Sequence, residues 1–248
     1  DVLQYGFGCR LTGEWMSGHQ TDLFSAFGGG AFSVTGLPCT GPPSGARRCH
    51  IVAALTRRSR GSNFREMDTL RTDCLVVGAG LAGAAYALYA ARAGLRVALV
   101  SRGGDYDANS DRAQGGIIYD PAGADGSLAG DIIEASAGTA NPAAVDHLVQ
   151  HGPRAVEELL MGEHPVDFDR EPDGSLQFTR EGGHSARRII HARDMTGHAI
   201  LKSIFKQVAE EPNITRHTGA VAVDLLTLSH NAEGAASRYA PLTCFGAW

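Results

Sequence analysis

Short apolar runs and longer helical patterns alternate along the chain from residue 73 onward. Residues 73–77 are typical of a short buried strand, residues 81–93 of an Ala-rich helix that ends at Gly94, and residues 96–101 of a second strand. A strand, a helix and another strand in this order predict a crossover unit within a parallel sheet. The fold class expected for this part of the chain is therefore α/β and Rossmann-like.

The alternation continues after this first unit. Residues 127–137 are expected to be helical, and Asn141-Pro142 supplies an N-cap and a first-turn proline for the next helix. Gly152-Pro153 is expected to start a separate helix that runs to residue 160. A Pro-Asp-Gly turn at residues 172–174 indicates a hairpin or a loop excursion. A helix over residues 196–210 and strands at 214–217, 220–228 and 244–248 complete the expected elements.

Residues 1–66 differ from the rest in composition. They contain eleven glycines, three of the five cysteines, seven arginines, no lysine and four acidic residues, without a sustained helical or strand period. We expect a poorly ordered extension here. Three origins stay open: a targeting peptide, a natural disordered extension, or sequence translated from upstream of a start at Met67.

Charge and cysteine usage narrow the function classes. A net charge of −5 without a basic stripe argues against nucleic-acid binding. The chain has no run of about 18 to 20 apolar residues that would cross a bilayer, so no membrane association is expected. The five cysteines form no CxxC pair and have no metal-type spacing with histidine, so neither a metal site nor a disulfide framework is expected.

A GxGxxG motif lies between the first expected strand and the first expected helix. The first glycine permits the tight turn, the second lets the main chain approach a pyrophosphate, and the third lets the helix pack closely on the strand. Unpaired N–H groups at the helix start would then face the phosphates. The predicted dinucleotide-binding residues are Gly78, Ala79, Gly80, Leu81, Ala82 and Gly83.

The end of the second strand usually carries an acidic residue that binds ribose hydroxyls. Ser101 occupies that position here, and Arg102 follows it. Serine can still hydrogen-bond a hydroxyl, and Arg102 could contact a phosphate or pack on adenine. The departure disfavours NAD without selecting FAD.

The stretch at residues 109–117 resembles the AQGG loop of the flavoprotein superfamily of succinate dehydrogenase, fumarate reductase and L-aspartate oxidase. A main chain with few side chains can lie flat against a flavin and its phosphate. The histidine that binds the flavin covalently in some members is matched by Asn109, so the resemblance implies noncovalent FAD. The residues it places at the cofactor in this loop are Asn109, Ser110, Ala113, Gln114, Gly115 and Gly116.

A second stretch, residues 179–197, is similar to one typical of the L-aspartate oxidase family. The resemblance makes Glu181 the substrate-site carboxylate that faces the amino group of L-aspartate. His184 and His191 are expected to be structural. The sequence around His198 is closer to that of succinate dehydrogenase. The resemblance also places the main chain of Val221 and Ala222 at the adenine side of FAD.

The resemblance implies oxidation of L-aspartate to iminoaspartate in NAD biosynthesis, with oxygen or fumarate as electron acceptor and quinolinate synthase as a downstream partner. It implies a cytoplasmic enzyme, or an organellar one if residues 1–66 are a targeting segment. The expected organisation is a partial FAD-binding domain over residues 67–248, with the start of a second α+β capping region and a truncated C-terminal end. We expect such a fragment to be inactive alone. The alternatives are a soluble fumarate reductase or succinate dehydrogenase-like flavoprotein, and a noncatalytic FAD-binding fragment.

Overall fold

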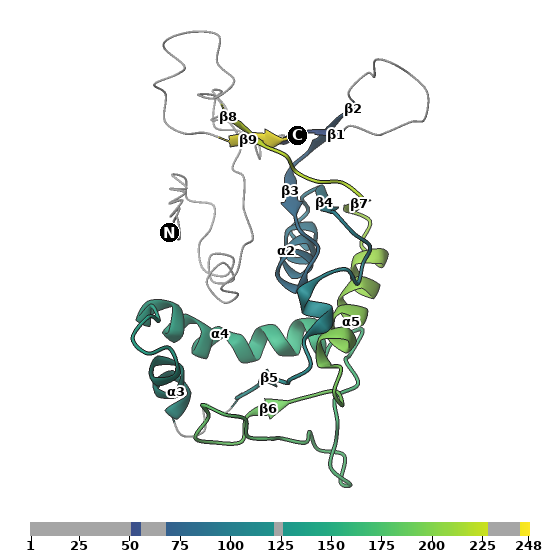
Figure 1. Ribbon diagram of the computed structural model, residues 1–248. Coiled ribbons are helices and arrows are strands. Elements are labelled where there is room, and N and C mark those ends of the chain that lie inside the picture. Colours follow the sequence, from purple (N-terminus) through teal and green to yellow (C-terminus); the bar gives the residue numbers. More distant parts are fainter. Residues whose placement is uncertain (1–50, 56–67, 122–125, 228–243) are drawn as a thin grey trace, which may run out of the picture.

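A parallel three-stranded sheet forms the centre of the computed structural model, which describes residues 51–55, 68–121, 126–227 and 244–248 (Figure 1). Its strands are β3 (Cys74–Val77), β4 (Val97–Ser101) and β7 (Ile214–Thr218), in the spatial order β3-β4-β7. Helix α2 (Leu81–Arg92) connects β3 to β4. The predicted strand–helix–strand unit and the α/β fold class are therefore confirmed.

The three strands of this sheet pair in parallel; β3 and β4 are buried along almost their whole length, whereas β7 is mostly exposed. Cys74 pairs with Val97, which in turn pairs with Ile214. Continuous apolar runs are the mark of parallel strands covered on both sides. At the strand entrances, the Asp73 carboxylate accepts hydrogen bonds from the backbone N–H and the guanidinium of Arg96, at 2.9 to 3.0 Å, which fixes how the two strands begin.

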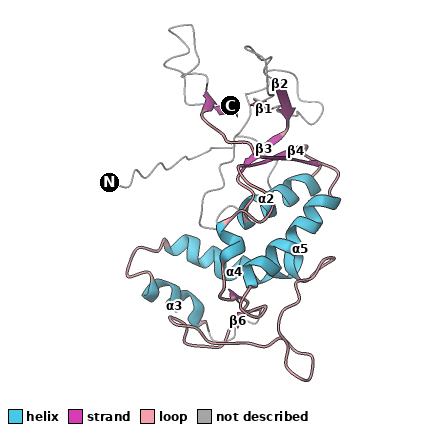
Figure 2. Cartoon of the chain, turned by 45° about the vertical axis from the view of Figure 1, so that its right-hand side comes forward, coloured by secondary structure: helices cyan, strands magenta, loops and turns pink. Residues whose placement is uncertain are grey.

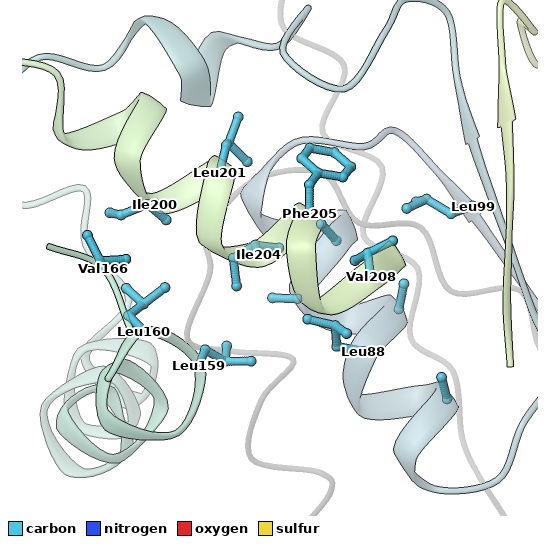
Figure 3. Close-up of a cluster of buried hydrophobic side chains, with 14 of the residues drawn as sticks. Leu88, Leu99, Leu159, Leu160, Val166, Ile200, Leu201, Ile204, Phe205 and Val208 are labelled. Atoms are coloured by element: carbon cyan, nitrogen blue, oxygen red, sulfur yellow. The ribbon is translucent and has the colours of Figure 1, made fainter. Parts of the chain in front are cut away.

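Helices cover one face of the sheet. Helix α5 (Thr196–Glu210) lies beside α2, and the end of α4 (Pro142–Leu160) closes the same core (Figures 1 and 2). Figure 3 shows the interior of this cluster, where side chains from the three helices and from β4 interdigitate. Leu88, Leu201 and Ile204 are completely buried there. Burial of this apolar area is the main source of stability for this part of the molecule.

A second sheet covers the opposite face. It has the order β2-β1-β9-β8, from β2 (Asp68–Thr72), β1 (Ile51–Leu55), β9 (Cys244–Ala247) and β8 (Leu225–Thr227). Buried Ala247 of β9 packs with Leu75 and Val100 of the parallel sheet. Residues close to both ends of the described chain are thus brought onto one side of the central sheet (Figure 1).

The remaining elements form a separate layer below the helices. Strands β5 (Ile117–Ile118) and β6 (Ile189–Ile190) pair in antiparallel fashion, and α3 (Ser127–Ala135) packs against α4 (Figure 2). The expected excursion at 166–180 is a short hairpin, closed by a bridge between Arg170 and Leu176.

Three expectations about the elements were wrong. Residues 142–160 form one continuous helix, because the buried Val145, Ala155 and Leu159 on both sides of Pro153 offset a cost of about 3 kcal/mol for an interior proline. Residues 220–224 are not a strand, and within the described residues 220–227 of the expected strand only β8 has strand structure. Ile51–Leu55 pairs as a strand with β2 and β9, within a segment expected to lack strand structure.

Some expectations fall where the structure gives no description. The rest of residues 1–66, including Cys9, Cys39 and Cys49, lies outside the described residues. Cys74 and Cys244 are free thiols, and burial raises the pKa of both. Among the described helices, none combines the length and the apolar character that a bilayer crossing needs.

Candidate functional site

A cleft of about 490 Å³ opens at the carboxyl ends of the parallel strands. In open α/β sheets, ligands bind at this edge. Three stretches that are distant in sequence line the cleft: the turn after β3, the segment from the end of β4 to the start of the 109–112 3-10 helix, and the segment after β7. Nine predicted cofactor residues line it: Gly78, Ala79, Gly80, Ser101, Arg102, Asn109, Ser110, Val221 and Ala222.

The turn after β3 has the geometry that the GxGxxG motif requires. Gly78 has a φ of +105°, which L side chains rarely adopt, and its N–H donates to the Val100 carbonyl at 2.8 Å. A Cβ on Gly83 would lie 1.9 Å from the Gly78 carbonyl oxygen, so helix and strand could not pack with a larger residue there. Leu81, Ala82 and Gly83 belong to α2 behind the turn and do not line the cleft.

The start of α2 suits a diphosphate. Gly80 caps the helix without a side-chain hydrogen bond, and no acidic residue lies in the first turn. The partial positive charge of the helix N-terminus is therefore not neutralised by a neighbouring carboxylate of that turn. The Leu81 N–H donates to Ser110 Oγ at 3.2 Å, which ties the first glycine motif to the second.

The ribose side of the cleft is formed after β4. The Ser101 hydroxyl donates to the Gly103 carbonyl at 2.8 Å, so its oxygen lone pairs remain available to accept from a ribose hydroxyl. The Ala220 N–H donates to the Ser101 carbonyl at 3.0 Å and brings the segment after β7 to the same place. Because this wall is mostly main chain, the residues present fit an FAD whose phosphates and ribose are recognised by backbone and small side chains.

Sequence reasoning missed part of the lining. Gly103, Gly104, Asp107, Ala108 and Ala220 also face the cleft, as do the strand ends at residues 77 and 100. The paired glycines directly after β4 were the available signal, since such a pair marks main chain that must pass close to a ligand or another segment. Nothing in the sequence distinguished Asp107 as a cleft residue, because Asp105 and Asp111 lie in the same loop.

We call residues 109–116 the AQGG stretch. Its second half lies outside the cleft. Ala113, Gln114, Gly115 and Gly116 do not line the cleft. The Gly116 N–H donates to Glu181 Oε1 at 3.3 Å, and a Cβ on Gly115 would lie 3.5 and 3.6 Å from the two carboxylate oxygens. The structure therefore brings the predicted substrate carboxylate against the second half of the AQGG stretch.

Strand pairing explains why these two stretches meet. Ile117 pairs with Ile190, and Ile118 with Ile189, directly after the AQGG stretch. Thr179 bridges Ile189 and lies two residues before Glu181. A Cβ on Gly116 would lie 2.5 Å from the Ile190 carbonyl oxygen, so this pairing accepts only glycine without adjustment.

The loop that carries Glu181 is anchored by a buried ion pair. The Arg188 guanidinium, 2% exposed, lies 2.8 Å from the Asp131 carboxylate. Ser185 donates to the same carboxylate from its N–H at 2.8 Å and from its hydroxyl at 2.9 Å. The Ser185 hydrogen bonds and the Arg188 charge outweigh the desolvation of Asp131 and lower the pKa of its carboxyl.

His191 makes a structural contact in this region. His191 Nδ1 lies 2.8 Å from Asp169 Oδ2, which also accepts from the Arg193 N–H. A wider hollow of about 840 Å³ is lined by His191 together with Thr179, Arg180 and Arg187, but not by Glu181. The carboxylate predicted to bind substrate thus faces the AQGG stretch and not this hollow.

Comparison with known proteins agrees with this geometry. Residues 73–239 match the family model described as FAD binding domain. The chain is 35% identical over 190 residues to a chloroplastic L-aspartate oxidase of Oryza sativa, covering 75% of this chain and 29% of the relative. It is 42% identical over 159 residues to L-aspartate oxidase 1 of Ralstonia nicotianae, covering 62% and 29%.

Solved structures point the same way. E. coli quinol fumarate reductase aligns with a TM-score of 0.55 and 29% identity, over 61% of this chain and 26% of the other. The apo Mycobacterium smegmatis Sdh1 complex aligns with a TM-score of 0.55 and 27% identity, over 61% and 28%. The chain spans about three-tenths of the length of the curated relatives that it matches.

Proposed function

Because this chain belongs to the FAD binding domain family, with FAD as its cofactor, we propose that it forms the FAD-binding part of an L-aspartate oxidase. The FAD diphosphate would lie along the Gly78–Gly80 turn and the start of α2, and the adenosine along the segment after β7. The flavin ring would extend toward the AQGG stretch. Asn109 supports noncovalent binding, because an amide side chain has no imidazole nitrogen to bond to the flavin.

The contact between Glu181 and Gly116 carries the proposal. It places a carboxylate at the edge of the AQGG stretch, where the ammonium of an amino acid would form a charge-assisted hydrogen bond. Succinate has no such group, so the carboxylate would favour aspartate by charge as well as by hydrogen bonding. The chemistry that bound FAD supplies is acceptance of a hydride from Cα of the substrate, which gives iminoaspartate. Oxygen or fumarate would then take up the electrons.

Two measurements test this proposal. Titration of the chain with FAD should give the visible absorption spectrum of protein-bound flavin. In the full-length protein that contains these residues, L-aspartate added without oxygen should bleach the flavin absorbance, whereas succinate should not. The Glu181→Gln variant should retain the FAD spectrum and lose most aspartate-dependent bleaching, because the neutral amide no longer attracts the ammonium.

The solved relatives keep one alternative in view, a fumarate reductase or succinate dehydrogenase-like flavoprotein. That function predicts bleaching by succinate and indifference to aspartate. A third outcome, a stable FAD spectrum that neither acid bleaches, would indicate a chain that binds FAD without catalysis.

A further inference from the structure

The start of α5 packs directly against the back of the loop that lines the FAD cleft. We call residues 104–113 the flavin loop. The Gly197 N–H donates to the Ala113 carbonyl at 2.9 Å, and a Cβ on Gly197 would lie 2.0 Å from the Ser110 carbonyl oxygen. The helix and the loop are therefore in main-chain contact, without side chains between them.

His198 adds two contacts beside this one. Its Nδ1 lies 2.8 Å from Asp111 Oδ1, and because an ionised carboxylate only accepts, Nδ1–H is the donor. The Tyr106 ring lies 5.2 Å from the His198 ring and 6.1 Å from the Phe205 ring, also on α5. The His198 and Asp111 side chains are 38% and 21% exposed, so water competes only partly for the hydrogen bond.

The opposite side of the same loop faces the cofactor. Asn109 and Ser110 line the cleft, and Ser110 Oγ accepts from the Leu81 N–H. The only regular element of the described loop is the 3-10 turn Asn109–Arg112, which is too short to be stable without tertiary contacts. Its position is therefore set by what packs behind it.

We propose that His198 and Asp111 form a clamp that holds the flavin loop in its FAD-binding position, with His198 as a positioning residue. Fixing the backbone of a loop costs about 1 to 2 kcal/mol per residue in conformational entropy. A loop that is already ordered before the cofactor arrives spares binding part of that cost. The proposal rests on the FAD site alone and is independent of which substrate is oxidised.

A double-mutant cycle on FAD affinity tests the clamp. His198→Ala and Asp111→Ala should each raise the FAD dissociation constant about three- to tenfold, the range for loss of a partly exposed charge-assisted hydrogen bond. The doubly substituted chain should bind about as weakly as either single variant, because both changes remove the same contact. His198→Asn, whose amide nitrogen takes the place of Nδ1, should restore affinity to within about twofold.

The control is His164→Ala. His164 pairs with Glu210 at 2.5 Å, also a histidine–carboxylate contact to α5 but at the far end of that helix. The His164→Ala variant should leave the FAD dissociation constant unchanged. Equal weakening by His164→Ala, strictly additive effects of the two clamp substitutions, or failure of His198→Asn to restore affinity would each overturn the proposal.

Hydrogen exchange separates this proposal from the proposed function. In the apo chain, the amides of residues 109–113 should exchange faster in His198→Ala than in His164→Ala. Unchanged exchange would count against the clamp, even if FAD binds. A chain that binds FAD and whose loop amides respond as expected, but whose flavin L-aspartate does not bleach, would count against the proposed function and leave the clamp standing.

Discussion

Replacing Gly83 with alanine gives a sharp test of how the nucleotide turn is built. An added Cβ would lie 1.9 Å from the Gly78 carbonyl oxygen, about 1.4 Å short of an ordinary C···O contact of about 3.3 Å. The obstacle is backbone, so α2 must move away from β3 and carry the cleft wall with it. We expect overpacking to cost about 3 kcal/mol, against a gain of about 1 kcal/mol in helix propensity. The net loss of about 2 kcal/mol would lower the thermal midpoint by roughly 4 to 8 °C.

Gly130→Ala provides the matched control for this substitution. Gly130 also lies inside a helix, α3, but nothing lies within 4 Å of the position its Cβ would take. There we expect only the propensity gain, a stabilisation of about 0.5 to 1 kcal/mol. Thermal melts and FAD titrations of both variants would check this. Equal midpoints and equal FAD affinities for the two variants would refute the close-packing explanation of Gly83.

Further predictions concern the core, the loop anchor and the cofactor linkage. Leu88→Ala, at a completely buried position, should cost about 3 kcal/mol, seen as a lower urea midpoint with an unchanged slope. Asp131 has a lowered pKa, so its stabilising effect is present above its ordinary value of 3.8 and is lost as the pH falls through the lower folded value. The protection factor of the Ser185 amide, which corrects for the intrinsic pH dependence of exchange, should therefore fall as the pH drops through this range, and it should lose that dependence in Asp131→Asn. Because Asn109 cannot bond covalently to the flavin, acid precipitation should release FAD into the supernatant; yellow colour retained in the pellet would contradict this.

The elements that the sequence predicted well depend on local signals. The glycine turn after β3 and the helix that follows it are specified within about 20 residues. Helix α5, Thr196–Glu210, has the bounds that its pattern predicted, because its apolar positions repeat with the helical period. Asn141 caps α4 as expected, accepting from the Ala143 N–H at 3.0 Å.

Three misses share a different cause, since each of them depends on partners distant in sequence. Pro153 is a local signal for a helix end, but burial on both sides of it outweighs that signal. The pairing of β1 with β9 joins residues near opposite ends of the described part of the chain, and no periodicity within either segment predicts it. The His198–Asp111 contact spans 87 positions, so neither residue revealed its partner.

The same distinction explains the division of the AQGG region into two environments. In the sequence, residues 109–116 are contiguous and rich in small and amide side chains, and they predict one continuous contact with a single ligand. In the structure, Ser110 is tied to the first turn of α2, whereas Gly116 is tied to Glu181 through the β5–β6 pairing. The two anchors lie toward opposite ends of the stretch, so one end lines the nucleotide cleft while the other contacts the Glu181 carboxylate. A change that shifts the β5–β6 register should therefore disturb Glu181 before it disturbs the nucleotide cleft, because the clamp at His198 and the Ser110 contact hold the other end independently.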